Sequence, residues 1–413
     1  MTLNILYNIG IYIASFHLKI IALFNHKIKL GVDGRSETFK KLREHIHKED
    51  KVIWFHCASL GEYEQGLPVF KVLRERYKSY KIVLTFFSPS GYEIRKHTNV
   101  ADVVVYLPLD TKYNARKFLN IVHPNFTVFV KYDIWPNYLK ELKKQNLRAI
   151  LISASFRSSQ SYFKIYGSRM RKALSAFEHI FVQNEQSKQL LNSINIEQVT
   201  LSGDTRYDRV SQQLEQNNTL DFIEEFLQGK TCMVIGSSWS EDEELLVTYI
   251  NKNLSNGVKY IIAPHNIKTN QIESFKINIK TKTILFSEKE NQNLSEFSVF
   301  IIDTIGLLSK IYSYADIAYV GGGMGTKGLH NILEPAVFGV PIVIGKNYEK
   351  FPEAKQMIEE AGVISIKNYK DLKEVLDTLI ENKIERQRMG DLNKSFVDKN
   401  KGAVTVITEY IRI

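Results

Sequence analysis

Short apolar runs alternate with helix-forming stretches along almost the whole chain, and this alternation constrains the fold more than any other feature. Each run is continuously apolar, as expected for strands of a parallel sheet that helices cover on both faces. The predicted strands are Val52–His56, Lys81–Phe87, Asp102–Tyr106, Phe126–Val130, Arg148–Ser153, His179–Gln183, Gln198–Leu201, Thr231–Gly236, Val258–Ala263, Thr283–Phe286, Ser298–Ile302, Asp316–Val320, Pro341–Ile344 and Val363–Ile366. We therefore expect an α/β protein with two doubly wound, Rossmann-like domains that face one another across a cleft.

The length of the chain agrees with two domains. At 413 residues it is too long for one ordinary hydrophobic core and suits two domains of about 200 residues each. The polar and acidic stretch 211–230 predicts a linker between a first domain, 31–210, and a second domain, 231–413. The last helix of the second domain is a candidate to pack back on the first.

The amino-terminal segment, residues 1–30, is expected to be a membrane anchor or an interfacial helix. Leu3–Phe24 is mostly apolar, but Asn4, Asn8, His17 and Lys19 interrupt it, so it is a mediocre transmembrane candidate. No small-residue cleavage site follows, which disfavours a signal peptide. Basic residues at its edge suit anionic lipid headgroups, and the alternative is an ordinary buried helix.

The net charge of +10 implies an anionic partner, and on charge alone nucleic acid, a membrane surface and phosphorylated substrates all stay open. The two cysteines, Cys57 and Cys232, lie far apart and have no metal-ligand spacing. They indicate a reducing compartment and neither a disulfide framework nor a metal site.

The stretch from His56 to Glu62, HCASLGE, follows the first predicted strand. Ligands of open α/β sheets bind at the carboxyl ends of the strands, so Glu62 is well placed to take a proton from a substrate hydroxyl. The alternative interpretation is a helix-capping Ser59 beside a solvated Glu62.

A glycine-rich loop dominates the second half of the chain. Gly321, Gly322 and Gly323 directly follow a strand, so the backbone could approach a phosphate closely, and a helix is expected to start near Leu329–Asn331. His330 or Asn331 could contact phosphate and Glu334 could bind ribose hydroxyls. The loop is not a Walker motif, and a plain tight turn is the alternative. Two further loops at strand ends, 236–244 and 263–266, support a nucleotide pocket, although Ser238 could be a helix cap and the acids of 241–244 could complement the helix dipole.

Seven motifs in order along the chain resemble the 3-deoxy-D-manno-octulosonic acid (Kdo) transferases of lipopolysaccharide biosynthesis. They are HCASLGE at 56–62, YDIWPN at 132–137, SASFRS at 153–158, LSGDTRYD at 201–208, GSSWSEDE at 236–243, IDTIGLL at 302–308 and VGGGMGTKGLHNILEP at 320–335. The resemblance implies a GT-B fold, with an acceptor-binding first domain and a second domain that binds the donor CMP-Kdo. It also implies a location at the cytoplasmic face of the inner membrane of a Gram-negative bacterium, and neither a metal ion nor a cofactor in the reaction.

The resemblance assigns roles to individual residues. It implies that Glu62 is the general base and that Arg206 stabilises the departing phosphate. The residues implied to bind the CMP part of the donor are Pro264, His265, Gly306, Leu307, Gly321, Gly322, Gly323, His330, Asn331 and Glu334. His265 stands where the family usually has arginine. Lys131 stands where the family usually has a glutamate assigned to the transition state, and Asp133 keeps the second acid of that motif.

The expected reaction is an inverting transfer of Kdo from CMP-Kdo to a phosphorylated, acylated lipid A precursor, lipid IVA, with Glu62 as the base. The expected partners are these two substrates and the anionic inner-membrane surface, and nucleic acid is not expected. Two alternatives stay open: a sugar-nucleotide 2-epimerase of the same fold, and a non-catalytic, membrane-attached nucleotide-binding protein, which the charge reversal at Lys131 favours.

Overall fold

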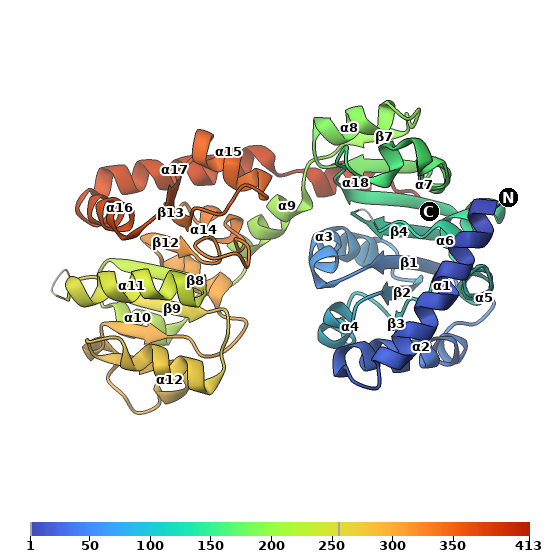
Figure 1. Cartoon of the computed structure of the whole chain (residues 1–413). Coiled ribbons are helices and arrows are strands. Elements are labelled where there is room, and N and C mark those ends of the chain that lie inside the picture. The colour runs from blue at the N-terminus through green and yellow to red at the C-terminus, as the bar shows by residue number, and fades with distance from the viewer. Residues whose placement is uncertain (1, 132, 255–256) are drawn as a thin grey trace. The chain divides into compact units, whose positions relative to one another are not determined.

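The chain forms two compact units in the computed structural model, which describes residues 2–131, 133–254 and 257–413 (Figure 1). Unit 1 contains Met1–Arg209 together with Lys401–Ile413, and unit 2 contains Val210–Asn400. Each unit is built on one parallel seven-stranded sheet, so the predicted pair of doubly wound α/β domains, the GT-B type of fold, is confirmed.

The sheet of unit 1 has the strand order β3-β2-β1-β4-β5-β6-β7. Its strands are β1 (Val52–Cys57), β2 (Lys81–Phe86), β3 (Val103–Tyr106), β4 (Phe126–Val130), β5 (Arg148–Ala154), β6 (His179–Val182) and β7 (Val199–Leu201). Its helices are α1 (Thr2–Ile21), α2 (His26–His45), α3 (Leu60–Arg76), α4 (Pro89–Arg95), α5 (Lys112–Val122), α6 (Pro136–Lys144), α7 (Ser168–Leu174), α8 (Glu185–Asn192), α9 (Thr205–Ser211, which runs into unit 2) and α18 (Ala403–Tyr410), with the short 3₁₀ turns η1 (Ser161–Phe163) and η2 (Ile165–Gly167).

The sheet of unit 2 has the order β10-β11-β9-β8-β12-β13-β14. Its strands are β8 (Cys232–Ser238), β9 (Lys259–Pro264), β10 (Thr283–Leu285), β11 (Val299–Ile301), β12 (Ile317–Val320), β13 (Ile342–Gly345) and β14 (Val363–Ile366). Its helices are α10 (Asp221–Leu227), α11 (Ser240–Lys252), α12 (Thr269–Ile277), α13 (Leu308–Ile311), α14 (Leu333–Ala336), α15 (Pro352–Glu360), α16 (Tyr369–Glu381) and α17 (Lys383–Asn400), with the 3₁₀ turns η3 (Gln212–Glu215), η4 (Phe286–Glu288), η5 (Leu294–Glu296) and η6 (Tyr312–Tyr314). In both units the strand order reverses beside the first strand, and ligands of such sheets bind at that switch point.

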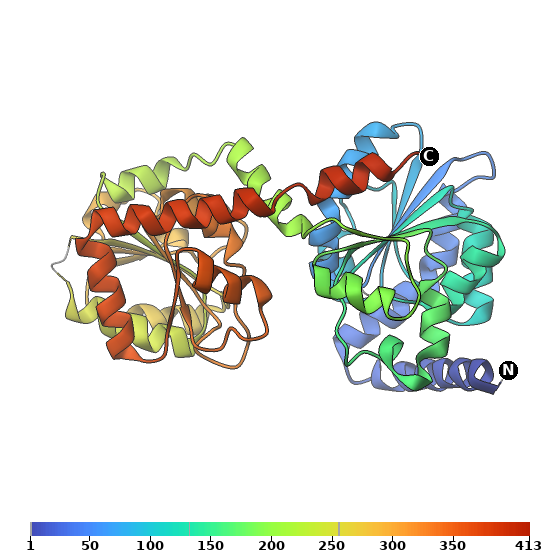
Figure 2. The ribbon, with the colours of Figure 1, turned by 90° about the horizontal axis from the view of Figure 1, so that it is seen from above.

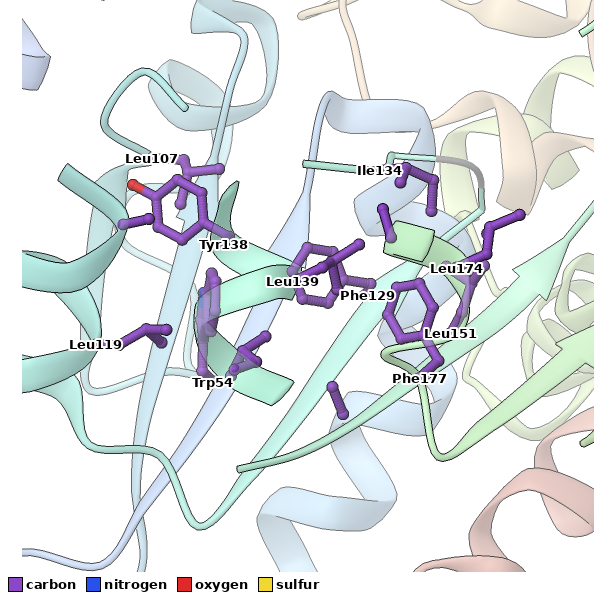
Figure 3. Packing of buried hydrophobic residues seen from close by; sticks show 14 of the residues in the cluster. Trp54, Leu107, Leu119, Phe129, Ile134, Tyr138, Leu139, Leu151, Leu174 and Phe177 are labelled. Atoms are coloured by element: carbon purple, nitrogen blue, oxygen red, sulfur yellow. The ribbon is translucent and has the colours of Figure 1, made fainter. Parts of the chain in front are cut away.

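One core of unit 1 is organised around Trp54, whose side chain is fully buried on β1. Its ring packs against Phe118, with a centroid distance of 4.8 Å, and against Phe129, with a distance of 5.2 Å. Figure 3 shows the side chains of Trp54 and Phe129 in this core, together with Tyr138, whose ring lies 5.8 Å from that of Trp54. A buried aromatic side chain of this kind stabilises a fold by about 3–5 kcal/mol relative to alanine, so this cluster holds β1 and its carboxyl end in place.

The last helix, α18, belongs to unit 1. Its residues Val404 and Ile407, with Ile411 just beyond it, are part of the second apolar core of that unit. The guanidinium of Arg148 donates to the carbonyl oxygen of Arg412 at 2.6 Å. The carboxyl-terminal end of the chain consequently lies against the first sheet (Figure 2).

The segment 211–230, expected to be a linker, contains the helix α10. Ile223, Phe226 and Leu227 of this helix are buried, and Phe226 contacts the ring of Phe300 on β11 at 5.3 Å between centroids. These apolar residues recur at positions i, i+3 and i+4, so they form one helix face that packs on unit 2.

The helix α1 leaves an apolar stripe exposed. Ile9, Ile13 and Phe16, spaced by four and three residues, are exposed by 48%, 52% and 63%. Side chains at this spacing share one face of a helix. Among the described residues, no helix has both the length and the apolarity needed to cross a bilayer.

Polar side chains of α1 bind to the body of unit 1 through Asp110. The Tyr7 hydroxyl donates to Asp110 Oδ2 at 2.7 Å, and the backbone amides of Asn137 and Tyr138 donate to the same carboxylate at 3.1 Å. The guanidinium of Arg169 lies 3.9 Å from the centre of the Tyr7 ring. A buried carboxylate therefore joins α1 to the start of α6.

Candidate functional site

Glu62 lies in the first turn of α3, immediately after the carboxyl end of β1. The Ser59 hydroxyl donates a hydrogen bond to the Glu62 carboxylate. Ser59 occupies the N-cap position of α3, but its side chain makes no capping hydrogen bond to the backbone. Glu62 is half-buried, so its carboxylate is held by one neighbour while part of it stays accessible to a substrate.

A buried imidazole holds Asp133 at the same edge of the sheet. Nε2 of His56, which is fully buried, lies 2.5 Å from Asp133 Oδ2, and its Nδ1 lies 2.7 Å from the Thr85 hydroxyl. The Trp135 indole also donates to Asp133 Oδ2, at 3.0 Å. The same indole nitrogen lies 2.9 Å from His56 Nε2, so the three side chains form one compact cluster at this strand end. The second oxygen, Oδ1, accepts no hydrogen bond from any described residue.

The thiol of Cys57 shows that both carboxylates lie near the end of β1. Burial raises the pKa of this thiol well above its ordinary value, and the charges of Glu62 and Asp133 raise it further. Cys57 is therefore a protonated, inert core residue, and two acids share this strand end.

The backbone at this edge takes the left-handed conformation at two non-glycine residues. Lys131, directly after β4, has φ of 70°, and Ser153, near the end of β5, has φ of 52°. The Lys131 amide donates to the carbonyl oxygen of Ile152 at 2.8 Å, which fixes the turn. Such conformations cost about 1–3 kcal/mol and cluster at functional sites. Tyr132, the next residue of the motif, lies outside the described residues.

Arg206 lies at the start of α9 and makes an ion pair with Asp204, with 2.8 Å between Nη2 and Oδ2. Its backbone amide also donates to Asp204, at 2.9 Å. Both residues belong to unit 1, whereas the glycine loop belongs to unit 2.

The glycine loop of unit 2 follows β12 and lies tightly against its neighbours. A Cβ atom at Gly321 would be 2.4 Å from the carbonyl oxygen of Ser237, and one at Gly323 would be 2.9 Å from the backbone nitrogen of Gly345. Gly322 has φ of +91°. A larger side chain would clash with the backbone of β8 at Gly321, with the carbonyl oxygen of Gly328 in the same loop at Gly322, and with the backbone of β13 at Gly323.

One buried carboxylate organises this loop. Asp242, in the first turn of α11, is fully buried and accepts hydrogen bonds from the Gly322 amide at 2.8 Å and the Tyr319 hydroxyl at 2.8 Å. It also accepts from the Trp239 amide at 3.0 Å. The sequence-based interpretation of Asp242 as an acid that merely complements the helix dipole is therefore incomplete. Its main partners come from β12 and the glycine loop, about 80 residues further along the chain.

Three aromatic rings meet beside the loop. Trp239 and His265 are stacked, with 4.3 Å between ring centroids, and His265 lies 4.6 Å from His330. The Trp239 indole donates to His330 Nε2 at 3.1 Å. Burial, with a contribution from His265, lowers the pKa of His330 to about 4, and burial also lowers the pKa of His265. Both imidazoles are therefore neutral at pH 7.

The side chains of Asn331 and Glu334, both expected to bind the nucleotide, contact each other. Asn331 Nδ2 donates to Glu334 Oε1 at 3.1 Å, and Asn331 Oδ1 accepts from the Leu333 amide at 3.2 Å. The helix expected to start near residues 329–331 starts instead at Leu333 and is short. Asn331 is the residue whose side chain caps its first turn, so the preceding loop extends further than expected.

Gly306 and Leu307 lie just before α13, and Gly306 is an exposed glycine with φ of +90°. Pro264 ends β9 and lines a hollow of about 770 Å³ between α11 and α12. Ser238 and Trp239 line the same hollow, so it adjoins the three rings. Inside it, burial raises the pKa of Glu243, which accepts a hydrogen bond from Ser238 at 2.9 Å.

The structure therefore places the predicted site residues in two groups. Glu62, Lys131 and Asp133 lie at the strand ends of unit 1, and the loop residues lie at the strand ends of unit 2. Two further residues, His56 and Trp239, were not assigned a role from the sequence, although each lies inside one of the motifs. Asp242 was interpreted only as an acid that complements the helix dipole. In the described part of the chain, no cluster of three or more His, Cys, Asp or Glu residues could hold a metal ion.

Comparisons with known proteins agree with this geometry. The family model described as 3-deoxy-D-manno-octulosonic-acid transferase (kdotransferase) matches residues 33–209. The chain is 26% identical over 375 residues to the 3-deoxy-D-manno-octulosonic acid transferase of Haemophilus influenzae, covering 87% of this chain and 86% of that one. It is 28% identical over 394 residues to the protein of the same name in Rickettsia felis, covering 92% of this chain and 82% of that one. The solved structure of UDP-GlcNAc 2-epimerase from Neisseria meningitidis has the same fold, with a TM-score of 0.61, 15% identity, and coverage of 87% of this chain and 98% of that chain.

Proposed function

Because this chain belongs to the Kdo transferase family of glycosyltransferases, we propose that it transfers Kdo from CMP-Kdo to a lipid A precursor, with inversion at the anomeric carbon. The observation that carries the proposal is the grouping of side chains at the strand ends. Unit 1 presents the carboxylate of Glu62 beside Asp133 and Lys131, and unit 2 presents a close-packed glycine loop with Asn331 and Glu334. The first set suits an acceptor hydroxyl and the second suits a nucleotide.

In the proposed reaction, Glu62 acts as the general base. Its carboxylate takes the proton of the acceptor's primary hydroxyl while that oxygen forms a bond to the anomeric carbon of Kdo. The bond from this carbon to the CMP phosphate breaks on the opposite face, and the electron pair leaves with the phosphate. General-base catalysis contributes about 10²–10⁴-fold to a rate, and alignment of the two substrates supplies much of the remainder.

The donor would be held by groups that the structure already orients. Glu334, fixed by Asn331, would accept hydrogen bonds from the ribose hydroxyls, and Pro264, Gly306 and Leu307 would lie along the nucleotide. The amides of Gly321–Gly323 and the guanidinium of Arg206 would stabilise the phosphate that departs. This chemistry needs no metal ion and no cofactor, because the phosphate is a good leaving group.

Lys131 and Asp133 would act on the substrates as a pair of opposite charges. Oδ1 of Asp133, which accepts no hydrogen bond from the residues that the structure describes, can accept one from a sugar hydroxyl, while His56 keeps the carboxylate in one orientation. Lys131 would bind an anionic group of the donor or of the acceptor, which in the proposed acceptor is a phosphate.

We also propose that the protein works at the cytoplasmic face of the inner membrane of a Gram-negative cell. The exposed stripe of Ile9, Ile13 and Phe16 on α1 supports an interfacial attachment, because an apolar helix face next to a basic edge suits an anionic lipid surface. Replacing all three by serine should abolish flotation with vesicles of phosphatidylethanolamine and phosphatidylglycerol. Ile305→Ser, which removes an apolar residue of unit 2 that is even more exposed than these three, is the control and should float like wild type. If the triple variant floats too, α1 is not the attachment.

The deciding experiment is a transfer assay with the purified full chain. Incubation with CMP-Kdo and a tetra-acylated disaccharide phosphate should yield a product heavier by one or more Kdo units, seen by mass spectrometry, together with free CMP. Incubation with UDP-GlcNAc tests the 2-epimerase activity. Epimerisation without transfer would overturn the proposal, and so would CMP-Kdo binding without any turnover, as expected of a non-catalytic binding protein.

A further inference from the structure

The three rings beside the glycine loop come from three strand ends of unit 2. Trp239 follows β8 and caps α11, His265 follows β9, and His330 follows the glycine loop after β12. Backbone hydrogen bonds hold the two histidines in place. The His265 amide donates to the carbonyl oxygen of Ser238 at 2.9 Å, and the His330 amide donates to the carbonyl oxygen of Gly321 at 3.1 Å. The arrangement is therefore part of the same framework as the donor loop.

The contact between Trp239 and His330 determines where the proton of His330 lies. The indole nitrogen of tryptophan can only donate a hydrogen bond, so Nε2 of His330, 3.1 Å away, must accept it and carries no proton. A neutral imidazole keeps one proton, which must then be on Nδ1. Burial keeps His330 neutral at pH 7, because it lowers the pKa of the ring to about 4.

The Nδ1–H group has no partner in the described ranges of the chain, although its ring is half-buried next to the loop. Among the described residues it is thus an oriented donor without an acceptor. The neighbouring residue, Asn331, donates a hydrogen bond to Glu334, which is also expected to bind the nucleotide. Lys327, whose Nζ lies 5.7 Å from the centre of the Trp239 ring, supplies positive charge on the same side. An anion that reaches this point would find both a fixed donor and a mobile cation.

We propose that Trp239 is a positioning residue that holds His330 as the Nδ1–H tautomer, and that this neutral donor binds a phosphate oxygen of the nucleotide donor. The ligand part of this inference rests on the proposed function, since it takes the nucleotide to be CMP. A neutral donor fits a half-buried position because it avoids the cost of burying an imidazolium before the ligand arrives. His265, stacked on Trp239, keeps the indole plane in place.

Two amide substitutions separate the ring nitrogens. His330→Asn places an amide nitrogen where Nδ1 is, whereas His330→Gln places one close to Nε2. Calorimetric titration of the full chain with CMP should give an affinity within about threefold of wild type for the Asn variant. The Gln variant should bind at least about tenfold more weakly, the loss expected for one hydrogen bond to a charged group. Trp239→Phe keeps a ring but removes the indole N–H, and it should weaken CMP binding by about three- to tenfold.

A spectroscopic measurement tests the tautomer independently of any ligand. In protein labelled with ¹⁵N-histidine, the resonance absent from His330→Gln identifies His330 among the ten histidines. It should show a proton on Nδ1 and a bare Nε2 at pH 7, and Trp239→Phe should populate both tautomers. A proton on Nε2 in the wild type would overturn the inference, and so would equal CMP affinities for the Asn and Gln variants. If wild type shows the Nδ1–H tautomer but binds no CMP, the proposed function and the ligand part both fail, and the role of Trp239 in the tautomer stands.

Discussion

Replacing Asp110 by asparagine should make the free energy of unfolding of unit 1 less dependent on pH. Asp110 is 1% exposed, and burial raises its pKa to about 6. The amides of Asn137 and Tyr138, the Tyr7 hydroxyl and the charge of Arg169 all lower this pKa, but burial outweighs them. Asparagine can keep the two backbone amides on its oxygen and turn its NH₂ group to the Tyr7 hydroxyl, so the geometry survives without the ionisable group.

The sign and size of this pH effect follow from the pKa of Asp110 in the folded chain and in the unfolded chain. A carboxyl group with a higher pKa in the folded than in the unfolded chain binds its proton more tightly when folded. Its protonation therefore stabilises the fold below about pH 6, and that stabilisation is lost as the pH rises through this value. With a folded pKa of about 6 and an ordinary value of 3.8, Asp110 should make wild type more stable at pH 5 than at pH 8 by on the order of 1 kcal/mol.

The measurement is urea unfolding at pH 5 and pH 8, followed by tryptophan fluorescence. The chain has three tryptophans, so a Trp239→Phe background leaves Trp54 and Trp135 to report on unit 1 alone. The stability gained between pH 8 and pH 5 should be smaller in Asp110→Asn than in its parent, by on the order of 1 kcal/mol. Asp33→Asn, at an exposed position of α2, controls for the loss of a carboxylate and should behave like the parent. A difference indistinguishable from zero, or of opposite sign, would refute the view that burial dominates at Asp110.

Three further substitutions test the site. Glu62→Gln should lower the rate of transfer at least about 10²-fold. It should leave CMP affinity unchanged, because the nucleotide loops lie in the other unit. Steady-state rates and calorimetry check this, and near-wild-type turnover would exclude Glu62 as the base. Lys131→Ala should raise the KM for one anionic substrate, with CMP-Kdo the expected one. Lys131→Glu should not exceed wild-type activity, and a markedly faster Glu variant would contradict the proposed role of the Lys131 ammonium group. Asp242→Asn should destabilise unit 2 by about 1.5–3 kcal/mol and weaken CMP binding, since its amide must face one of the donors that the carboxylate accepts. Urea unfolding followed by tryptophan fluorescence measures the stability of unit 2 through the part of the signal that Trp239→Phe removes, with exposed Glu244→Gln as the control. Equal stabilities of the two variants would count against the central place of Asp242.

The strands could be predicted from sequence because a buried parallel strand must be apolar on both faces. Each predicted run overlaps an observed strand, and no end differs by more than two residues. The structure of segment 211–230 was harder to predict, because only Ile223, Phe226 and Leu227 mark the buried face of α10. Three apolar residues in a polar stretch do not show which surface they cover.

The site was predictable where one motif contains both partners, and not where partners are distant in sequence. Asn331 and Glu334 are three residues apart, so both lie within one motif that marks them together, and their contact is local. Asp242 also looks like an ordinary first-turn acid, because nothing near it in the sequence indicates that Gly322 will donate to it. The same holds for Tyr7 and Asp110, which are 103 residues apart and meet only in the folded unit.

The return of α18 to unit 1 has a consequence for synthesis on the ribosome. The sheet of unit 1 is complete in sequence at Leu201, but the helix that covers α3 and the Phe181 ring begins only at Ala403. At about 5–20 residues per second, the intervening chain of about 200 residues takes roughly 10–40 s to make, and unit 2 can fold within that time. During this interval the nascent first sheet shows apolar surface to chaperones and to neighbouring chains. The part of the protein that is translated first is therefore the last to be finished.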